Sequence, residues 1–174
     1  MDMAALAAAR AIAAGVDWVQ IREKDLSVRH LLELVQRAVL LAAGSRTKIV
    51  VNSRPDIALA AHAAGMHLPA GSISPQTWRA MTPRGFLIGV SCHTIDEVAE
   101  AEASDANYVL FGPVFAPTSK ASDLAPRGLA GLTAAAQAVR IPVLALGGIT
   151  DANAQSCVDA GAAGVAGISM FQTC

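Results

Sequence analysis

The fold is decided by the stretch Tyr108-Val-Leu-Phe-Gly-Pro-Val-Phe-Ala-Pro-Thr-Ser-Lys120. Its first four residues form a short apolar run of the length and type that suit a buried strand. A glycine and a proline then end that run. The loop beyond them carries Thr118, Ser119 and Lys120, and two hydroxyls beside an ammonium can hold a phosphate. The same residues are also typical of a solvated loop, so the stretch predicts a buried strand and leaves anion binding open.

The same succession of apolar run, polar turn and helix repeats along the rest of the chain. Strands are expected at residues 16–21, 48–51, 65–68, 86–90, 107–111, 142–146 and 164–168. Helices are expected at residues 4–14, 28–43, 55–64, 75–81, 95–103, 129–139 and 151–160. This alternation predicts βα units and a parallel sheet. The strands are continuously apolar, as expected when both faces of the sheet are covered.

Polar residues before several helices fit the N-cap position, where a side-chain oxygen accepts a backbone N–H. Ser27 precedes one expected helix and Thr150 precedes the last. Thr94, with Glu97 three residues later, predicts a capping box. His62 is expected in the middle of a helix, on the surface. These residues give the prediction testable helix boundaries.

Seven strands and about as many helices of this size indicate a (β/α)8 TIM barrel, or part of one. A doubly wound sheet is the alternative. No Gly-x-Gly-x-x-Gly follows the first strand, which removes the commonest reason to choose that alternative. The composition does not change along the chain, so we expect one domain over residues 1–174.

The composition narrows the possible partners and compartment. The hydrophobic fraction of 53% lies above the usual ~45–50%, so a substantial core can form. A net charge of -1 gives no reason to expect a nucleic acid or an anionic membrane as partner. The cysteines Cys92, Cys157 and Cys174 have no metal-type spacing and favour a reducing compartment. With no clear signal peptide or membrane span, we expect a cytoplasmic protein.

Polar groups gather where the expected strands end, and in a barrel these ends meet at one mouth. The candidate binding residues are Gln20, Arg22, Lys24, Asn52, Ser91, Thr118, Ser119, Lys120, Gly147, Gly148 and Ser169. His67 and His93 also follow or end strands. Each has a plainer interpretation: the charges after residue 21 are solvated, Asn52 makes a turn, and His67 is packed in the interior.

Gly147 and Gly148 can be interpreted in two ways. Two glycines directly after an apolar strand let backbone N–H groups approach an anion, and the next helix adds its N-terminus. They also suit a simple tight turn. Cys92 beside His93 does not indicate a nucleophilic dyad, because no third group in the sequence is seen to orient the histidine.

The carboxylates give no reason to predict a metal site. Glu23 and Asp25 are the only acidic pair at a strand end, and no convincing carboxylate pair for Mg²⁺ is present. We therefore expect no resident metal from the residues themselves.

Between residues 9 and 171 the chain resembles the thiamine phosphate synthases and their TenI-like relatives. The motifs that carry the resemblance are Gln20-Ile-Arg-Glu-Lys24, Val51-Asn-Ser-Arg54, Asp56-Ile-Ala-Leu59, His67-Leu68, Ser91-Cys-His93, Phe111-Gly-Pro-Val-Phe115, Thr118-Ser-Lys120, Ala145-Leu-Gly-Gly-Ile149 and Gly164-Val-Ala-Gly-Ile-Ser169. In the synthases this pattern implies the joining of a phosphorylated thiazole to a hydroxymethylpyrimidine pyrophosphate, with loss of pyrophosphate.

The resemblance also implies roles for the candidate residues. Gln20, Arg22, Lys24 and Asn52 would face the pyrimidine and its pyrophosphate, with Ser91 beside them. The segment 118–120 would meet the pyrophosphate and the thiazole side. Gly148 and Ser169 would hold the thiazole phosphate.

Two departures from the synthase pattern concern the metal. The synthases usually have an aspartate after the asparagine, where this chain has Ser53, and another shortly after His-Leu, where it has Ser72. Those carboxylates hold Mg²⁺, and serine hydroxyls are poor substitutes. Mg²⁺ is therefore expected only if the protein acts as a synthase.

The stretch from His67 to Pro75 is more similar to the TenI-like branch, whose characterised reaction is tautomerisation of a thiazole carboxylate phosphate. That reaction needs a general acid–base. The tautomerases carry a histidine where this chain has Pro113, so His93, which that branch shares, is the expected catalytic residue. A non-catalytic ligand-binding or regulatory protein is the third possibility.

The resemblance starts after the family's first strand and stops before its last helix. An open barrel would expose sheet edges and apolar helix faces. We therefore expect either a truncated reading frame or a shortened form that associates, for example as a homo-oligomer.

Overall fold

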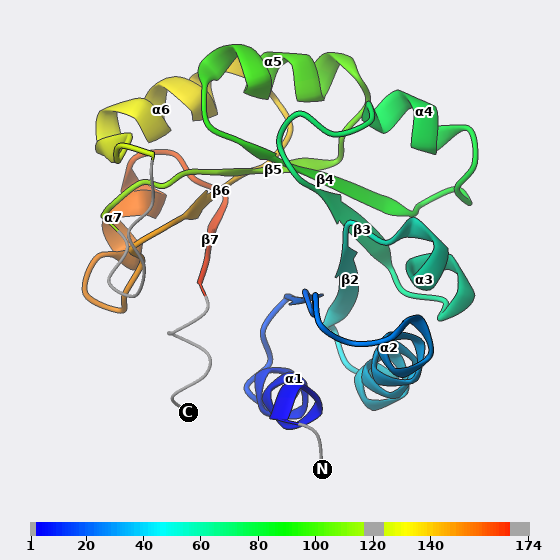
Figure 1. The fold of residues 1–174 in the computed structure, drawn as a ribbon. Helices are drawn as coiled ribbons and strands as arrows, with labels where there is room; N and C mark the ends of the chain where they lie inside the picture. Colours follow the sequence, from blue (N-terminus) through cyan, green and yellow to red (C-terminus); the bar gives the residue numbers. More distant parts are fainter. Residues whose placement is uncertain (1–2, 117–123, 168–174) are drawn as a thin grey trace. The chain divides into compact units, whose positions relative to one another are not determined.

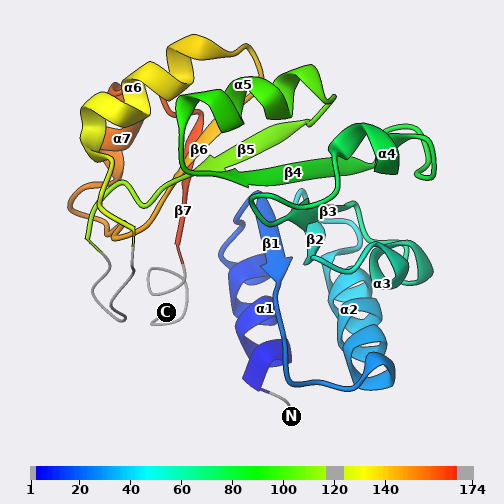
Figure 2. The same cartoon turned by 45° about the horizontal axis from the view of Figure 1, so that its top comes forward.

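The computed structural model describes residues 3–116 and 124–167, in which seven helices and seven strands alternate. The chain forms two compact units (Figures 1 and 2). The first unit contains residues 3–67 together with Thr82–Leu87, and the second contains Leu68–Met81 and the described residues from Ile88 onward.

The first unit is built on three parallel strands. Its helices and strands are α1 (Met3–Ala13), β1 (Trp18–Ile21), α2 (Val28–Ala42), β2 (Lys48–Asn52), α3 (Pro55–Ala60) and β3 (Gly65–Leu68). The strands pair in the order β1, β2, β3. Each connection between successive parallel strands passes through a helix, which is the βα arrangement that the sequence predicts.

The register of these strands places three buried apolar side chains on one face and polar side chains on the other. Ile21, Val51 and Met66 are register partners, and all three are buried. Because side chains alternate along a strand, their neighbours in sequence lie on the other face. On that face Asn52 of β2 and His67 of β3 are register partners.

Helix α2 packs against β2 and its neighbouring helices with one apolar stripe. Its buried residues are Leu31, Leu34, Val35, Ala38 and Ala42, at the three-and-four spacing of an α-helix face. Ser27 begins the helix by accepting a hydrogen bond from the backbone N–H of His30 at 3.3 Å, as predicted. The stripe and the cap thus place α2 where the sequence predicts it.

The second unit is built on four parallel strands and four helices. Its elements are α4 (Pro75–Arg79), β4 (Leu87–Cys92), α5 (Ile95–Ala103), β5 (Tyr108–Phe111), α6 (Gly128–Ala138), β6 (Val143–Leu146), α7 (Ala154–Asp159) and β7 (Gly164–Ala166). The strands pair in the order β4, β5, β6, β7. Helices α5, α6 and α7 pack in succession over one face of these strands (Figure 1).

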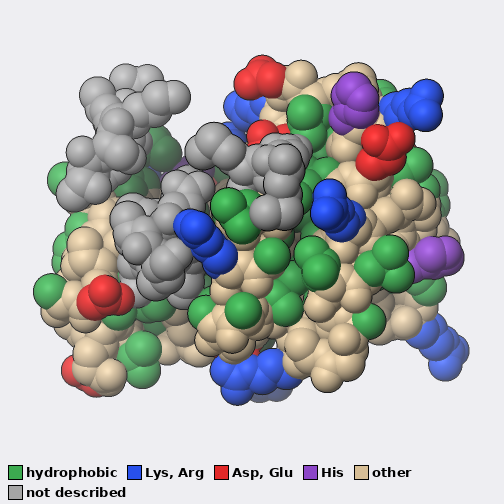
Figure 3. Space-filling view, turned by 90° about the horizontal axis from the view of Figure 1, so that it is seen from below, with side chains coloured by type: hydrophobic (Ala, Val, Ile, Leu, Met, Phe, Trp, Pro, Cys, Tyr) green, Lys and Arg blue, Asp and Glu red, His purple; other side chains and the backbone are tan. Residues whose placement is uncertain are grey.

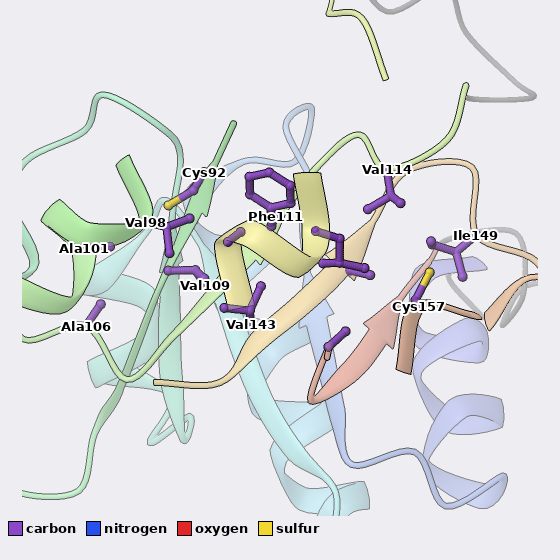
Figure 4. Close-up of a cluster of buried hydrophobic side chains, with 14 residues drawn as sticks. Cys92, Val98, Ala101, Ala106, Val109, Phe111, Val114, Val143, Ile149 and Cys157 are labelled. Carbon is purple, nitrogen blue, oxygen red and sulfur yellow. The ribbon is translucent and has the colours of Figure 1, made fainter. Parts of the chain in front are cut away.

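The core of the second unit lies between that face and the helices (Figure 4). Cys92, Phe111 and Ala145 are register partners on the inner row and are buried. Val98 of α5 and Cys157 of α7 reach the same cluster and are completely buried. The apolar runs found in the sequence therefore form strands whose one face is covered by three helices.

The opposite face of β4 and β5 requires a glycine. Gly89 and Tyr108 are register partners, and a Cβ on Gly89 would lie 2.0 Å from the Cζ of the Tyr108 ring. The ring is therefore packed directly on the glycine backbone. Burial raises the pKa of the Tyr108 hydroxyl above its ordinary value.

The alternating α/β architecture is confirmed, and so is the capping box, in which Thr94 Oγ1 accepts from Glu97 N and the Glu97 carboxylate accepts from Thr94 N. Three local predictions are wrong. Asn153, and not Thr150, stands at the N-cap of α7, because residues 150–153 form a turn in which Thr150 N donates to Asn153 Oδ1. His62 is exposed, as predicted, but it lies beyond the end of α3, with a left-handed φ of 55°. Ser91 and Cys92 belong to β4 itself.

Within the described residues, no helix has the length and apolar character needed to cross a membrane. The single domain over residues 1–174 and the (β/α)8 barrel remain predictions. What the structure establishes is the α/β alternation and the parallel pairing inside each unit.

Candidate functional site

The first unit carries four of the predicted binding residues at the ends of its strands. Gln20 lies in β1, and Arg22 and Lys24 follow it; all three are exposed. Asn52 ends β2 and is half-buried. Gln20, Asn52 and His67 occupy the same face of the three strands. Their convergence on one binding mouth stays a prediction.

The turn after Asn52 has a defined geometry. Ser53 has a left-handed φ of 56°, and its backbone N–H donates to the carbonyl of His67 at 2.9 Å. The Asn52 amide donates to Ser53 Oγ at 2.9 Å. These contacts fit the interpretation of Asn52 as the start of a turn, and the Ser53 N–H joins that turn to the end of β3.

His67 is an interior residue. It is 1% exposed, and burial lowers the pKa of its imidazole to about 4. The interpretation of His67 as a packed histidine is therefore confirmed by its burial.

An ion pair that the sequence analysis did not single out lies just beyond this turn. The Arg54 guanidinium donates to both carboxylate oxygens of Asp56, at 2.9 and 2.6 Å. The hydrogen bonds from Arg54 lower the pKa of the Asp56 carboxyl below its ordinary range. In the sequence, an arginine two residues before an aspartate at the start of a helix could have indicated this ion pair. The pair occupies the first turn of α3, which follows the strand end.

The second unit carries His93, the predicted catalytic residue. His93 follows β4 directly and is half-buried. Its Nδ1 lies 2.6 Å from the carbonyl oxygen of Gly112. A carbonyl can only accept, so Nδ1 carries the proton and donates it. In the neutral ring Nε2 is then the nitrogen with a free lone pair, which is the form that a general base needs.

The carbonyl of Gly112 is thus the orienting group that the sequence could not reveal. Gly112 is held in place by its own N–H, which donates to the carbonyl of Cys92 at 3.1 Å. A Cβ at Gly112 would lie 2.1 Å from the carbonyl oxygen of Leu146, so only glycine fits there. The close approach of three strand ends therefore positions the carbonyl on which His93 rests.

Cys92 is not a nucleophile beside this histidine. Its side chain belongs to the core cluster and is completely buried (Figure 4). Burial, with a smaller effect from the Glu97 carboxylate, raises the pKa of the thiol to about 12. The rejection of a Cys92–His93 dyad stands, but the reason given for it was wrong: the histidine is oriented, and the thiol is inert.

Gly147 and Gly148 both have left-handed backbone conformations, with φ of 97° and 62°. They pack against the segment after β5: a Cβ on Gly147 would lie 2.6 Å from Pro113 Cα, and one on Gly148 would lie 2.6 Å from the Ala116 carbonyl oxygen. The tight-turn interpretation is therefore sufficient to explain two glycines. The phosphate seat remains a prediction, and the six-residue α7 is too short to add much dipole to it.

A small cavity of about 110 Å³ lies in the second unit, between the loop before α4 and helix α5. Ser72 and Ser91 are among its lining residues, together with Glu97 and Glu100. Ser91 is half-buried within β4. The cavity brings together one predicted binding residue and the serine at the second position where the synthases usually have aspartate.

Thr118, Ser119, Lys120 and Ser169 lie outside the described residues, so the roles expected for them stay predictions. Within residues 3–116 and 124–167, no three histidine, cysteine, aspartate or glutamate side chains come together as a metal site would require. On the face drawn in Figure 3, the basic and acidic side chains are scattered among apolar and neutral ones.

Residues 2–171 match the family model described as thiamine monophosphate synthase. A putative thiamine-phosphate synthase from Geobacter sulfurreducens is 45% identical over 159 residues, which cover 91% of this chain and 75% of that protein. The putative thiamine-phosphate synthase 2 of Aquifex aeolicus is 40% identical and covers 90% and 83%. The thiamine-phosphate synthase of Chlorobium luteolum is 38% identical and covers 92% and 76%.

A solved structure of thiamine phosphate pyrophosphorylase from Pyrococcus furiosus superimposes with a TM-score of 0.88 at 29% identity, over 98% of this chain and 81% of that one. FabK from Thermotoga maritima shares the fold alone, at 18% identity and a TM-score of 0.70, over 97% of this chain and 54% of that one. The motifs, the alternation of strands and helices, and the match over almost the whole sequence lead to one conclusion: the chain belongs to the thiamine monophosphate synthase family.

Proposed function

We propose that the protein binds a phosphorylated thiazole at the carboxyl ends of its strands and catalyses a TenI-like tautomerisation, with His93 as the general acid–base. We further propose that the strands belong to a (β/α)8 barrel and that the protein works in the cytoplasm without a resident metal. The observation that carries the proposal is the 2.6 Å contact between His93 Nδ1 and the Gly112 carbonyl.

That contact suits proton transfer for a simple reason. A base must present a lone pair in a fixed direction, and a ring held by its Nδ1–H presents Nε2. Tautomerisation removes a proton from one carbon of the thiazole and returns one at another position, so a single nitrogen can accept the proton and give it back. No leaving group departs, and no pyrophosphate charge has to be neutralised.

The residues at the two positions where the synthases usually have aspartate do not fit Mg²⁺. Ser53 and Ser72 offer neutral hydroxyls, and Ser53 Oγ already accepts a hydrogen bond from Asn52. Mg²⁺ prefers carboxylate oxygens together with substrate phosphates. These serines support a reaction that does not depend on a protein-bound metal.

A working thiamine phosphate synthase is the second candidate, and the names of the relatives favour it. The Chlorobium luteolum relative, 38% identical to this chain, is named as a thiamine-phosphate synthase. In this reading Gln20, Arg22, Lys24 and Asn52 bind the pyrimidine pyrophosphate, Gly148 and Ser169 bind the thiazole phosphate, and the metal is held mainly by the pyrophosphate. Restoring carboxylates in S53D/S72D should then raise the rate of thiamine phosphate formation.

One set of incubations separates the candidates. The protein is mixed with the pyrimidine pyrophosphate and the thiazole phosphate, with and without Mg²⁺, and thiamine phosphate is measured. In parallel the thiazole carboxylate phosphate is supplied alone, and its isomerisation is followed by proton NMR. We expect isomerisation without metal and no thiamine phosphate; metal-dependent thiamine phosphate would establish the synthase instead.

The role of His93 is tested with H93A. We expect the isomerisation rate to fall by about 10²-fold or more, which is the usual contribution of a general acid–base. H30A is the matched control, because His30 is an exposed residue of α2. Ligand-induced thermal stabilisation should survive in H93A. Unchanged turnover in H93A would remove the assignment of the base, and stabilisation without turnover in the wild type would indicate a binding protein.

A further inference from the structure

Glu97 makes a contact that its role in a capping box does not require. In the box its carboxylate accepts from the backbone N–H of Thr94 at 3.1 Å, and its own N–H donates to Thr94 Oγ1 at 3.2 Å. Its Oε2 also accepts from the backbone N–H of His93. One carboxylate oxygen therefore holds two successive N–H groups, and the second belongs to the residue that carries the imidazole.

His93 is consequently fixed from two sides. Glu97 holds its backbone, and the carbonyl of Gly112 holds its ring at Nδ1. The two contacts come from different elements, one from the first turn of α5 and one from the end of β5. If the backbone of His93 moved, its side chain would have to leave its present rotamer to keep the 2.6 Å contact with the Gly112 carbonyl.

We propose that Glu97 is a positioning residue that holds the backbone of His93 so that its ring keeps the Nδ1–H tautomer and presents Nε2 to the substrate. The importance of this positioning for turnover rests on the proposed function. The hydrogen bonds that Glu97 accepts are seen in the structure and do not depend on that function. Removal of the carboxylate leaves the partly buried N–H of His93 and the exposed N–H of Thr94 without this acceptor and lets the turn between β4 and α5 relax.

The direct test measures the tautomer of His93. The protein is labelled with ¹⁵N-histidine, and the His93 signals are identified by their absence in H93A. At alkaline pH, where imidazoles are neutral, the wild type should show a protonated Nδ1 and an unprotonated Nε2. E97A should show a mixture of tautomers, and E97Q, whose amide oxygen can still accept, should recover the wild-type pattern. E97D, shorter by one methylene, takes the place of E97A if that variant does not fold.

T94A is the matched control. It removes the hydroxyl half of the capping box but leaves the contact between Glu97 and His93, so it should keep the wild-type tautomer. In the isomerisation assay E97A should lose about 10-fold or more in kcat, with little change in KM, since misplacement of a catalytic group by one ångström can cost ~10²-fold. T94A should stay within about 2-fold of the wild type by the same argument.

The outcomes distinguish this inference from the proposed function. An E97A spectrum identical to that of the wild type overturns the positioning role, and so does a T94A variant that loses the tautomer as completely as E97A does. If the wild type isomerises no thiazole, the proposed function fails while the tautomer measurement still decides whether Glu97 positions His93. If turnover is found and E97A affects KM alone, Glu97 acts in binding and the inference is wrong.

Discussion

The burial of His67 makes the stability of the protein depend on pH in a way that can be calculated. The imidazole is 1% exposed, and its pKa is lowered to about 4 in the folded protein, against an ordinary value of 6.5. Below pH 6.5 the unfolded chain takes up a proton that the folded protein does not bind. Stability is therefore highest above pH 6.5 and falls as the pH drops from 6.5 toward 4.

The size of the effect follows from that difference. The full difference between the two pKa values corresponds to a loss of ~3 kcal/mol of unfolding free energy, which is complete below about pH 4. Between about pH 7.5 and about pH 5 the same relation gives a loss of ~2 kcal/mol from this residue. Such a loss is a substantial part of the 5–15 kcal/mol that stabilises a typical domain, on the order of a factor of 30 in the unfolding equilibrium.

Urea unfolding at a series of pH values measures this contribution. Tryptophan fluorescence and far-UV circular dichroism report the transition, and the wild type is compared with H67Q, which has a side chain of similar size that does not titrate. We expect the unfolding free energy of H67Q to fall by ~2 kcal/mol less than that of the wild type between about pH 7.5 and pH 5. H30Q controls for the loss of a histidine, because His30 is exposed on α2. If the wild type and H67Q show parallel pH profiles, burial does not suppress protonation of His67 and the reasoning fails.

Two further substitutions, L132A and G89A, test the packing of the second unit, and L40A in α2 of the first unit is the control for L132A. L132A should lower the unfolding free energy by ~2–5 kcal/mol, because Leu132 is completely buried in the core cluster; L40A should cost less than ~0.5 kcal/mol, since Leu40 is 75% exposed. G89A should destabilise the protein by more than ~2 kcal/mol, because its Cβ would overlap the Tyr108 ring at 2.0 Å; a G89A variant that melts at the wild-type temperature would show that the ring moves aside freely.

Local signals predicted the succession of elements well. The seven apolar runs became the seven strands, and Ser27 and the Thr94–Glu97 box begin their helices as expected. The two caps depend on residues within one turn of each other, so the local sequence is enough to predict them. The prediction that Thr150 caps the last helix was wrong because Asn153 supplies a competing side-chain acceptor three residues later. The turn that this acceptor closes delays the start of the helix.

For the site, the sequence predicts which residue types are present but not how they are oriented. That His93 is oriented could not be read from the sequence, because its partner is a backbone carbonyl nineteen residues away. Every residue has a backbone carbonyl, so the amino-acid type does not show which carbonyl orients the histidine. In the sequence, Gly112 looks like any other glycine at the end of a strand. Likewise the left-handed φ of Ser53 could not be predicted, because serine itself has no preference for that conformation; in the structure it accompanies a backbone hydrogen bond to the end of β3.

The contact between the loop after β6 and the segment after β5 has a consequence for how this family can change over evolution. Gly147 and Gly148 fill their places only because Pro113 to Ala116 leave no room for a Cβ, and backbone bonds from Val114 and Phe115 to Leu146 and Gly147 lock the two pieces together. The atoms that a new Cβ would meet include backbone atoms of Pro113 and Ala116, so no change of side chain in that segment can make room for it. Libraries that diversify the two loops should therefore return folded variants only where both glycines are kept, whatever the side chains around them become.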